Sequence, residues 1–275
     1  MTQTRAYALP PGGLLPQATR ARDRAVFTDA YAFIPASTMS DIVTSLLPGW
    51  TRTRAWIIAR PLSGFAETFA QYIVEVSQHG GATNPEPDAG AEGVLFVVGG
   101  LGTLTMNGTE YDLRPGSYVY IPPATEWKID NPHTGEFTFH WIRKRYEPVP
   151  GLDAPEAFVT HDDDVTPDAM PDTNGAWATS RFVDANDLRH DMHVTIVTFQ
   201  PGGIIPFAET HVMEHGLYVL QGRGNYLLNQ DWVEVEPGDF MWLRAFCPQA
   251  CYAAGAEPFR YLLYKDVNRH PSLTL

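Results

Sequence analysis

Three side chains of the kinds that bind metal ions stand close together in the second half of the sequence, namely Glu209, His211 and His215. They are separated by two and four residues, so on an extended strand all three would point to the same face. One carboxylate and two imidazoles on one face form a donor set that suits a divalent metal ion. The spacing therefore predicts a metal site on this stretch.

The elements that must position this site are expected to be short strands. The chain has 23 glycines and 23 prolines, which favour many turns over long helices. The pair Asn107-Gly108 between alternating apolar segments indicates a tight hairpin, and similar apolar segments recur along the chain at regular spacing. This pattern is typical of a β-sandwich or a barrel.

The strand pattern occurs twice. Gly203 and Gly222, which flank the metal-binding stretch, correspond to Gly80 and Gly99 at the same separation. A repeat of this length indicates two copies of one fold, and a polar, proline-rich stretch separates them. The predicted division is an N-terminal barrel at 1–147, a linker at 148–180 and a C-terminal barrel at 181–275.

The spacing of glycines and ligands resembles that of the cupin superfamily. The first cupin motif, G-x5-H-x-H-x3-4-E-x6-G, is matched from Gly203 to Gly222, with Glu209 in the first histidine slot and His215 in the glutamate slot. The second motif places Gln249 where cupins carry their last histidine. The resemblance implies an all-β bicupin, with two tandem cupin barrels of the double-stranded β-helix or jelly-roll type.

The two copies differ in their ligand slots. In the C-terminal copy the slots hold Glu209, His211, His215 and Gln249, and the amide oxygen of Gln249 favours hard, oxygen-tolerant ions such as Mn²⁺, with other divalent metals as alternatives. In the N-terminal copy the same slots hold Glu86, Asp88, Glu92 and Trp127. Because that set has no imidazole, we expect the N-terminal barrel to be metal-free and structural.

Several motifs are similar to those of the (S)-ureidoglycine aminohydrolases, which are manganese-dependent bicupins of purine (allantoin) catabolism. The similarity extends over roughly residues 30–270, and its strongest element is the unusual Glu/His/His/Gln ligand set. The other matching motifs are Glu209–Gly216, Gly238–Met241, Tyr264–Arg269 and Lys144–Gly151. The resemblance implies hydrolysis of (S)-ureidoglycine to (S)-ureidoglycolate and ammonia.

The same resemblance places Lys265, Tyr261 and Tyr226 at the substrate. A small ureido acid needs a cation for its carboxylate, which the Lys265 ammonium would supply. The predicted catalytic residues are Glu209, Lys265 and Tyr261. Either Glu209 or Tyr261 would act as the base or proton relay, and the sequence leaves that choice open.

Other residues near the site have simpler interpretations. Glu214 breaks the alternation of the ligands and is expected to be a solvated or interface carboxylate. Cys247 and Cys251 are expected to be packed, unreactive thiols. His193 is a core histidine or a hydrogen-bonding partner of the ligands. Arg244 would either form a structural ion pair or contact the substrate.

Two competing functions remain. A cupin oxygenase or isomerase that uses Fe²⁺ would also need two imidazoles and a carboxylate. A bicupin can also be a non-catalytic ligand-binding protein. Oxygen uptake would identify the first, and retained metal without ammonia release would identify the second.

Charge and composition limit the partners. The formal net charge of −13 and the lack of a long basic run argue against nucleic acid. No apolar stretch is long enough for a membrane-spanning helix, and two cysteines suit a reducing cytoplasm. We expect a small ureido substrate as the ligand and, from the edge strands and 12% aromatic residues, a homo-oligomer.

Overall fold

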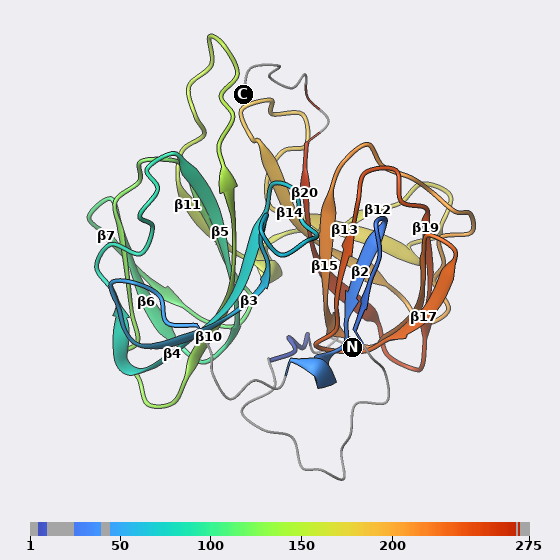
Figure 1. Cartoon of the computed structure of the whole chain (residues 1–275), viewed down its shortest axis with the longest axis horizontal. Helices are drawn as coiled ribbons and strands as arrows, with labels where there is room; N and C mark the ends of the chain where they lie inside the picture. Colours follow the sequence, from blue (N-terminus) through green and yellow to red (C-terminus); the bar gives the residue numbers. More distant parts are fainter. Residues whose placement is uncertain (1–4, 10–24, 40–44, 268, 270–275) are drawn as a thin grey trace.

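The computed structural model describes residues 5–9, 25–39, 45–267 and 269, and it contains two β-barrels that lie side by side (Figure 1). Within these residues the helical segments are two short 3-10 turns, at Ala36–Thr38 (η1) and Asp162–Asp164 (η2). The predicted all-β architecture of two tandem barrels is confirmed. Among the described residues no helix has the length and apolar character to cross a membrane.

The N-terminal barrel is one sheet in the order β11-β8-β5-β10-β4-β9-β6-β7, with β3 paired to β4. Its strands are β3 (Trp50–Ala59), β4 (Ala70–Ala82), β5 (Ala91–Gly99), β6 (Gly102–Met106), β7 (Thr109–Leu113), β8 (Ser117–Ile121), β9 (Trp127–Asp130), β10 (Phe137–Arg145) and β11 (Phe158–His161). The hairpin between β6 and β7 turns at Asn107 and Gly108, which both have positive φ, as the sequence predicted.

The C-terminal barrel has two sheets, in the orders β1-β2-β18-β15-β20-β14-β13-β12 and β17-β16-β19. Its strands are β1 (Val26–Phe27), β2 (Tyr31–Ile34), β12 (Asp168–Ala169), β13 (Trp177–Arg181), β14 (Met192–Phe199), β15 (His215–Gln221), β16 (Arg223–Leu228), β17 (Asp231–Val235), β18 (Phe240–Leu243), β19 (Gln249–Ala254) and β20 (Phe259–Asp266).

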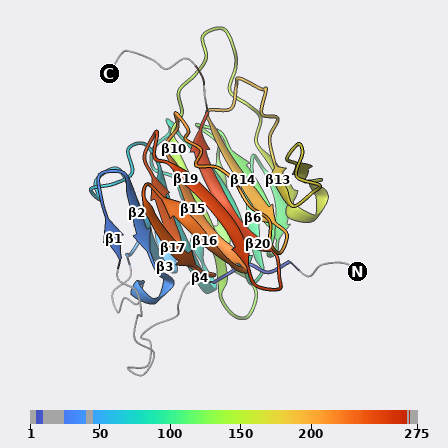
Figure 2. The ribbon, with the colours of Figure 1, turned by 90° about the vertical axis from the view of Figure 1, so that its right-hand side faces the viewer.

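Two strands lie in barrels to which the predicted division does not assign them. Strand β2 comes from the start of the chain but pairs with β18, where Phe33 stands opposite Met241, so it belongs to the C-terminal barrel, between β18 and β1 (Figures 1 and 2). Strand β11 follows the N-terminal barrel in the sequence and pairs with β8. The stretch 148–180 therefore holds β11, β12 and most of β13 as paired strands, although it was expected to be a linker.

Alternation along β15 and β20 divides the side chains between two cores. Leu217 and Tyr261 face the interior of the C-terminal barrel. Tyr218 on β15 and Leu262 and Tyr264 on β20 point to the opposite face of the sheet. They join a second core that also contains side chains of the N-terminal barrel. The two-residue period of a strand thus lets one strand line the cavity of its own barrel and hold the other barrel in place.

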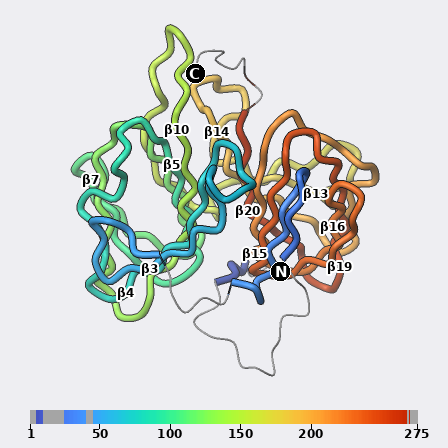
Figure 3. Tube along the Cα trace, in the orientation of Figure 1, coloured from blue at the N-terminus to red at the C-terminus, as the bar shows by residue number. Residues whose placement is uncertain are grey.

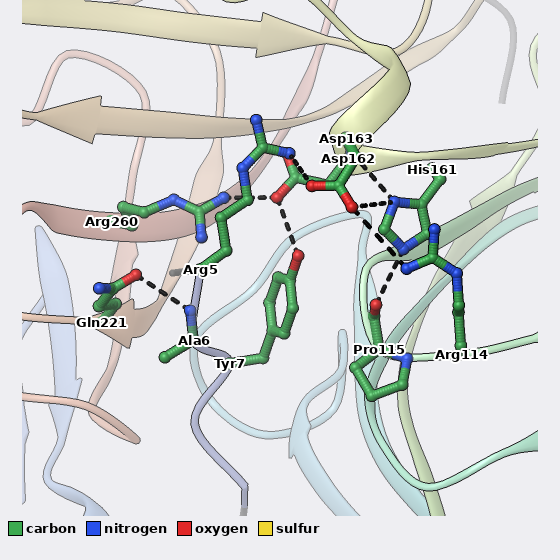
Figure 4. Close-up of polar contacts among 10 residues, drawn as sticks. All are labelled: Arg5, Ala6, Tyr7, Arg114, Pro115, His161, Asp162, Asp163, Gln221 and Arg260. Atoms are coloured by element: carbon green, nitrogen blue, oxygen red, sulfur yellow. Dashed lines mark hydrogen bonds and ion pairs between the residues drawn. The ribbon is translucent and has the colours of Figure 1, made fainter. Parts of the chain in front are cut away.

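The first described segment of the chain runs along the seam between the barrels (Figure 3). The backbone N–H of Ala8 donates to the carbonyl of Leu220 at 2.9 Å, and the Tyr7 hydroxyl donates to Asp162 at 3.0 Å. Asp162 is fully buried and also accepts from Arg260 at 2.5 Å (Figure 4). This charge pair links the segment after β11 to β20 of the C-terminal barrel.

Candidate metal centre

A cavity of about 130 Å³ inside the C-terminal barrel gathers the side chains that the sequence singled out. All of the predicted metal, substrate and catalytic residues line it, namely Glu209, His211, His215, Tyr226, Gln249, Tyr261 and Lys265. They come from four strands, β15, β16, β19 and β20, and from the loop before β15, so only the folded barrel brings them together. Their individual roles stay predictions.

The stretch from Glu209 to His215 does not form the single strand that the sequence analysis expected. Only His215 lies in a strand, as the first residue of β15, while Glu209 and His211 lie in the loop before it. Glu209 is nevertheless fixed by a two-way backbone pairing with Gln249, with both N–H···O distances at 2.9 Å. The carbonyl of His211 accepts from the N–H of Phe246 at 2.6 Å. These two contacts replace the strand as the means of positioning.

The four predicted ligands touch one another in a chain. The His211 Nε2 atom is 3.4 Å from Glu209 Oε1, Glu209 Oε1 is 3.4 Å from Gln249 Nε2, and Gln249 Oε1 is 3.2 Å from His215 Nε2. In the described part of the chain, no group of three His, Cys, Asp or Glu side chains is close enough to hold a metal ion. Two of these contacts, Glu209 to His211 and Gln249 to His215, join pairs of atoms that can bind a metal, and ligand atoms about 2.1 Å from one ion are roughly 3.0 to 3.4 Å apart, so these two spacings fit a shared cation.

The protonation of His215 supports the same conclusion. The side chain is buried, and burial lowers its pKa to about 4, so the imidazole is neutral at pH 7. Its Nδ1 atom is 3.2 Å from the carbonyl of Met213 and its Nε2 atom is 3.2 Å from the Gln249 carbonyl oxygen, and both oxygens can only accept. A neutral imidazole carries one N–H, so one of its two nitrogens presents a lone pair to an acceptor oxygen. Two acceptors directed at each other are stabilised by a cation between them.

Two tyrosines continue the contacts from Gln249 into the barrel. The Tyr226 hydroxyl donates to Gln249 Oε1 at 2.8 Å, and the Tyr226 and Tyr261 hydroxyls are hydrogen-bonded to each other. Burial raises the pKa of both phenols well above their ordinary value. Both therefore stay protonated and act as hydrogen-bond donors at neutral pH.

Lys265 lies on β20 between two other strands that line the barrel. It stands opposite His193 on β14 and His215 on β15. The pKa of the Lys265 ammonium is lowered, mainly by burial and to a smaller extent by the nearby positive charge of Arg181. Both cations also line a neighbouring cavity of about 210 Å³.

Arg181 is the one cation of the ligand cavity that the sequence analysis missed. It is the last residue of β13, whose alternate side chains Trp177, Thr179 and Arg181 all line the cavity. The alternation was present in the sequence. It was overlooked because the residues before 181 were assigned to a linker.

The corresponding slots of the N-terminal barrel hold ion pairs and a packed indole. Glu86 binds Arg143 at 2.5 Å, and Asp88 lies 3.7 Å from Arg145. Glu92 is buried and accepts from the Tyr120 hydroxyl at 2.9 Å. Each of the first two carboxylates is thus balanced by a guanidinium of β10. That this barrel is metal-free stays a prediction.

The remaining residues near the site have structural surroundings. Glu214 lies at the interface between the barrels, which was one of its two predicted places, and is 4% exposed. Arg244 forms an ion pair with Glu67 at 2.9 Å. Cys247 and Cys251 are buried thiols whose pKa burial raises, as expected for unreactive side chains.

His193 is also buried, and its Nε2 atom has no hydrogen-bond partner among the described residues. Burial lowers its pKa to about 4. The side chain faces the neighbouring cavity that Arg181 and Lys265 share. The core histidine of the two sequence interpretations is the one that agrees with this burial.

Comparison with known proteins agrees with the fold. The family described as "Cupin domain" matches twice, at residues 72–143 and 195–264. An (S)-ureidoglycine aminohydrolase from Escherichia coli (strain K12) is 31% identical over 244 residues, covering 84% of this chain and 87% of the relative. The enzyme of the same name from Arabidopsis thaliana is 32% identical over 249 residues, covering 90% of this chain and 79% of the relative.

Among solved structures, a Pseudomonas aeruginosa protein described as a "Glyoxylate Induced Protein" is 61% identical to this chain. The match covers 99% of this chain and 100% of that one, with a TM-score of 0.92. The bicupin arrangement and the placement of β2 and β11 therefore belong to a fold shared over the whole chain.

Proposed function

The chain belongs to the (S)-ureidoglycine aminohydrolase family of cupin proteins, and we propose that it hydrolyses (S)-ureidoglycine to (S)-ureidoglycolate and ammonia, with Mn²⁺ as the metal. The observation that carries the proposal is the single cavity lined by Glu209, His211, His215 and Gln249 together with two tyrosines and a lysine. Its volume of about 130 Å³ suits a substrate of this size.

The proposed metal ligands are Glu209, His211, His215 and Gln249, each of which contacts at least one other member of the set in the cavity. Three supply a carboxylate oxygen, an amide oxygen and a neutral imidazole nitrogen, and His211 adds the second imidazole. When bound, the metal would act as a Lewis acid and would hold the substrate in one orientation. The mixture of oxygen and nitrogen donors supports Mn²⁺.

The substrate would lie between the metal ligands and β20. Lys265, whose ammonium has no ion pair or hydrogen bond within the described residues, would bind the carboxylate. The Tyr226 proton is already donated to Gln249, so Tyr226 would contact the substrate as an acceptor for a ureido N–H, and Tyr261 would turn its hydroxyl to donate to the ureido carbonyl oxygen. Three contacts to one small molecule would select one face of its chiral carbon.

The reaction replaces the C–N bond to the amine with a C–O bond from water. The departing amine needs a proton, and the attacking water must lose one. The raised pKa of Tyr261 makes its phenol a poor base, so we assign the base to the Glu209 carboxylate. Tyr261 remains a hydrogen-bond donor that orients the substrate.

The proposal is tested by ammonia release from freshly generated ureidoglycine, using protein stripped of metal and then given Mn²⁺. We expect stereospecific release that depends on the added metal. Oxygen uptake without ammonia release would favour the cupin oxygenase. Tight retention of metal with neither activity would favour a ligand-binding protein.

We also propose that the protein acts in the cytoplasm as a homo-oligomer. Both cysteines are free thiols, which suits a reducing compartment. Exposed apolar side chains gather beside a cavity of about 350 Å³ on the outer face of the β16–β19 sheet, namely Ile204, Phe207, Trp232 and Tyr252. Such a patch supports a contact between copies, and analytical ultracentrifugation of wild type against Trp232→Glu would test it.

A further inference from the structure

A second cation faces the candidate active site besides Lys265. The Arg181 side chain is 34% exposed and lines the ligand cavity at the end of β13. Arg181 and Lys265 also line the adjacent cavity of about 210 Å³, so both stand where the two cavities meet. The charge of Arg181 is close enough to lower the pKa of the Lys265 ammonium.

The existing partners of these two cations leave their charge largely unbalanced. The Nε atom of Arg181 is 3.5 Å from Asp168, whose side chain is 71% exposed, and a solvated pair of this kind contributes little. Within the described residues Lys265 makes no ion pair or hydrogen bond, and the nearest carboxylate of the cavity, Glu209, is a predicted metal ligand. Two neighbouring cations without an anion between them repel each other.

We infer that Arg181 and Lys265 together form the binding site for the substrate carboxylate, with Arg181 as the specificity-determining residue. A guanidinium offers two parallel N–H donors that match the two oxygens of a carboxylate, whereas an ammonium acts as a point charge. The substrate identity rests on the proposed function, but the chemical class does not, because any small carboxylate with a ureido tail presents the same groups.

This placement fixes the direction of the substrate. The carboxylate lies toward Arg181 at the end of β13 and Lys265 on β20, and the amine-bearing carbon lies toward Glu209 and Gln249. The local positive charge also attracts an anion to a chain whose net charge is −13, which would otherwise repel it.

The experiment measures binding of ureidoacetate, which carries the ureido and carboxylate groups without the reacting amine. Isothermal titration is done on wild type, Arg181→Gln and Arg181→Lys, with and without added Mn²⁺. We expect Arg181→Gln to weaken binding roughly 10- to 100-fold, as for the loss of a charged hydrogen bond, and Arg181→Lys to lie between. Equal affinity of Arg181→Gln and wild type would overturn the inference.

Two matched variants separate ligand binding from a structural role. Asp168→Asn removes the ion pair of Arg181 but leaves the guanidinium, so ureidoacetate should bind as well as or better than in wild type. If Asp168→Asn weakens binding as much as Arg181→Gln does, the ion pair is the cause and the inference fails. Arg223→Gln breaks a similar exposed pair with Glu236, away from the cavity, and should change nothing.

A neutral ligand gives the second control. The amide of ureidoacetate lacks the negative charge, so it should bind wild type weakly and Arg181→Gln equally weakly. Selective loss of the acid but not of the amide supports the inference even if wild type releases no ammonia from ureidoglycine, in which case only the proposed function fails. An equal loss of both ligands would show that Arg181 acts on the shape of the cavity instead.

Discussion

The carboxylate of Glu214 in the C-terminal barrel accepts hydrogen bonds from the backbone N–H of Thr68 at 2.9 Å and from its hydroxyl at 3.2 Å, although Thr68 precedes β4 of the N-terminal barrel. The same carboxylate accepts from the backbone of Glu67 at 3.0 Å and from the Trp242 indole at 3.0 Å. Glu214 directly precedes His215. The N-terminal barrel is thereby tied to the backbone that carries a predicted metal ligand.

Replacing Glu214 with Gln should destabilise the protein by about 3 kcal/mol, because the amide nitrogen would face donors in a buried site. We expect a lower urea midpoint and, since His215 is the next residue, weaker metal retention. Glu234→Gln, at an exposed position of β17, is the matched control. An unchanged midpoint for Glu214→Gln would mean that the interface does not depend on this carboxylate.

Glu209→Gln should lose both metal and turnover. The substitution keeps the size of the side chain but removes the one negative charge of the predicted ligand set, and we expect at least a roughly 100-fold fall in ammonia release. Metal content is measured by mass spectrometry on the same preparation. A variant with full metal and full rate would remove Glu209 from both roles.

Tyr226→Phe tests whether the tyrosine orients Gln249. It removes the 2.8 Å hydrogen bond to the Gln249 carbonyl and leaves the ring in place. We expect metal affinity to fall roughly 10-fold or more, as for other groups that orient ligands. Tyr252→Phe, which changes a 43% exposed tyrosine, should leave the affinity as it is. Equal affinities for both variants would contradict the assignment.

Glu92→Gln should become more stable relative to wild type as pH rises. Burial raises the pKa of Glu92 to about 7, above the value of 4.5 for an ordinary glutamate. Between these values the folded state binds more protons than the unfolded state, so the stability of wild type that depends on Glu92 is lost as pH rises through about 7. Urea midpoints of both proteins at pH 5 and pH 8 measure the difference.

The sign of that difference is the decisive result. Glutamine cannot ionise, so the urea midpoint of the variant minus that of wild type should increase from pH 5 to pH 8. For Glu110→Gln, at an exposed position, the same difference should be equal at both pH values. A difference for Glu92→Gln that decreases as pH rises would show that the charged carboxylate is stabilised in the folded state.

Phe33→Ala should weaken the C-terminal barrel. Phe33 lies on β2, is 4% exposed and belongs to the core that contains Leu217 and Tyr261. Truncating a buried phenylalanine costs about 3 to 5 kcal/mol, which a urea titration detects. Phe27→Ala on the neighbouring β1, where the ring is 60% exposed, should cost far less. Similar losses for the two variants would argue against β2 as part of this core.

The sequence was sufficient for the fold because glycine spacing and strand alternation are local signals. Gly203 and Gly222 with their earlier counterparts indicated two barrels, and both Asn107 and Gly108 adopt the turn that they predicted. The ligands predicted from the motif spacing, and Tyr226, Tyr261 and Lys265, which the family resemblance suggested, all line one cavity, and their roles stay predictions. The separation of Glu209 and His211 from β15 was not predictable, because it depends on a backbone pairing with the distant Gln249.

The position of Arg181 in the cavity and the pairing of β2 with the C-terminal barrel were not predicted, for a related reason. Each depends on which strands become neighbours after folding, and nothing in residues 26–34 or 177–181 alone specifies a partner. Strand β2 pairs with β18, and the paired residues Phe33 and Met241 are more than two hundred positions apart in the sequence. Long-range pairing of this kind is decided by the complete core and not by the local pattern.

The pairing of β2 with β18 also constrains how the protein is made. Phe33 leaves the ribosome more than two hundred residues before Met241, so the two cannot meet until β18 has been made. Until then β2 has β1 as its native neighbour but lacks β18, and closing the sheet depends on slow, non-local pairing or on a chaperone. The metal-bearing barrel is therefore expected to close late, with β1 and β2 among the last strands to join it.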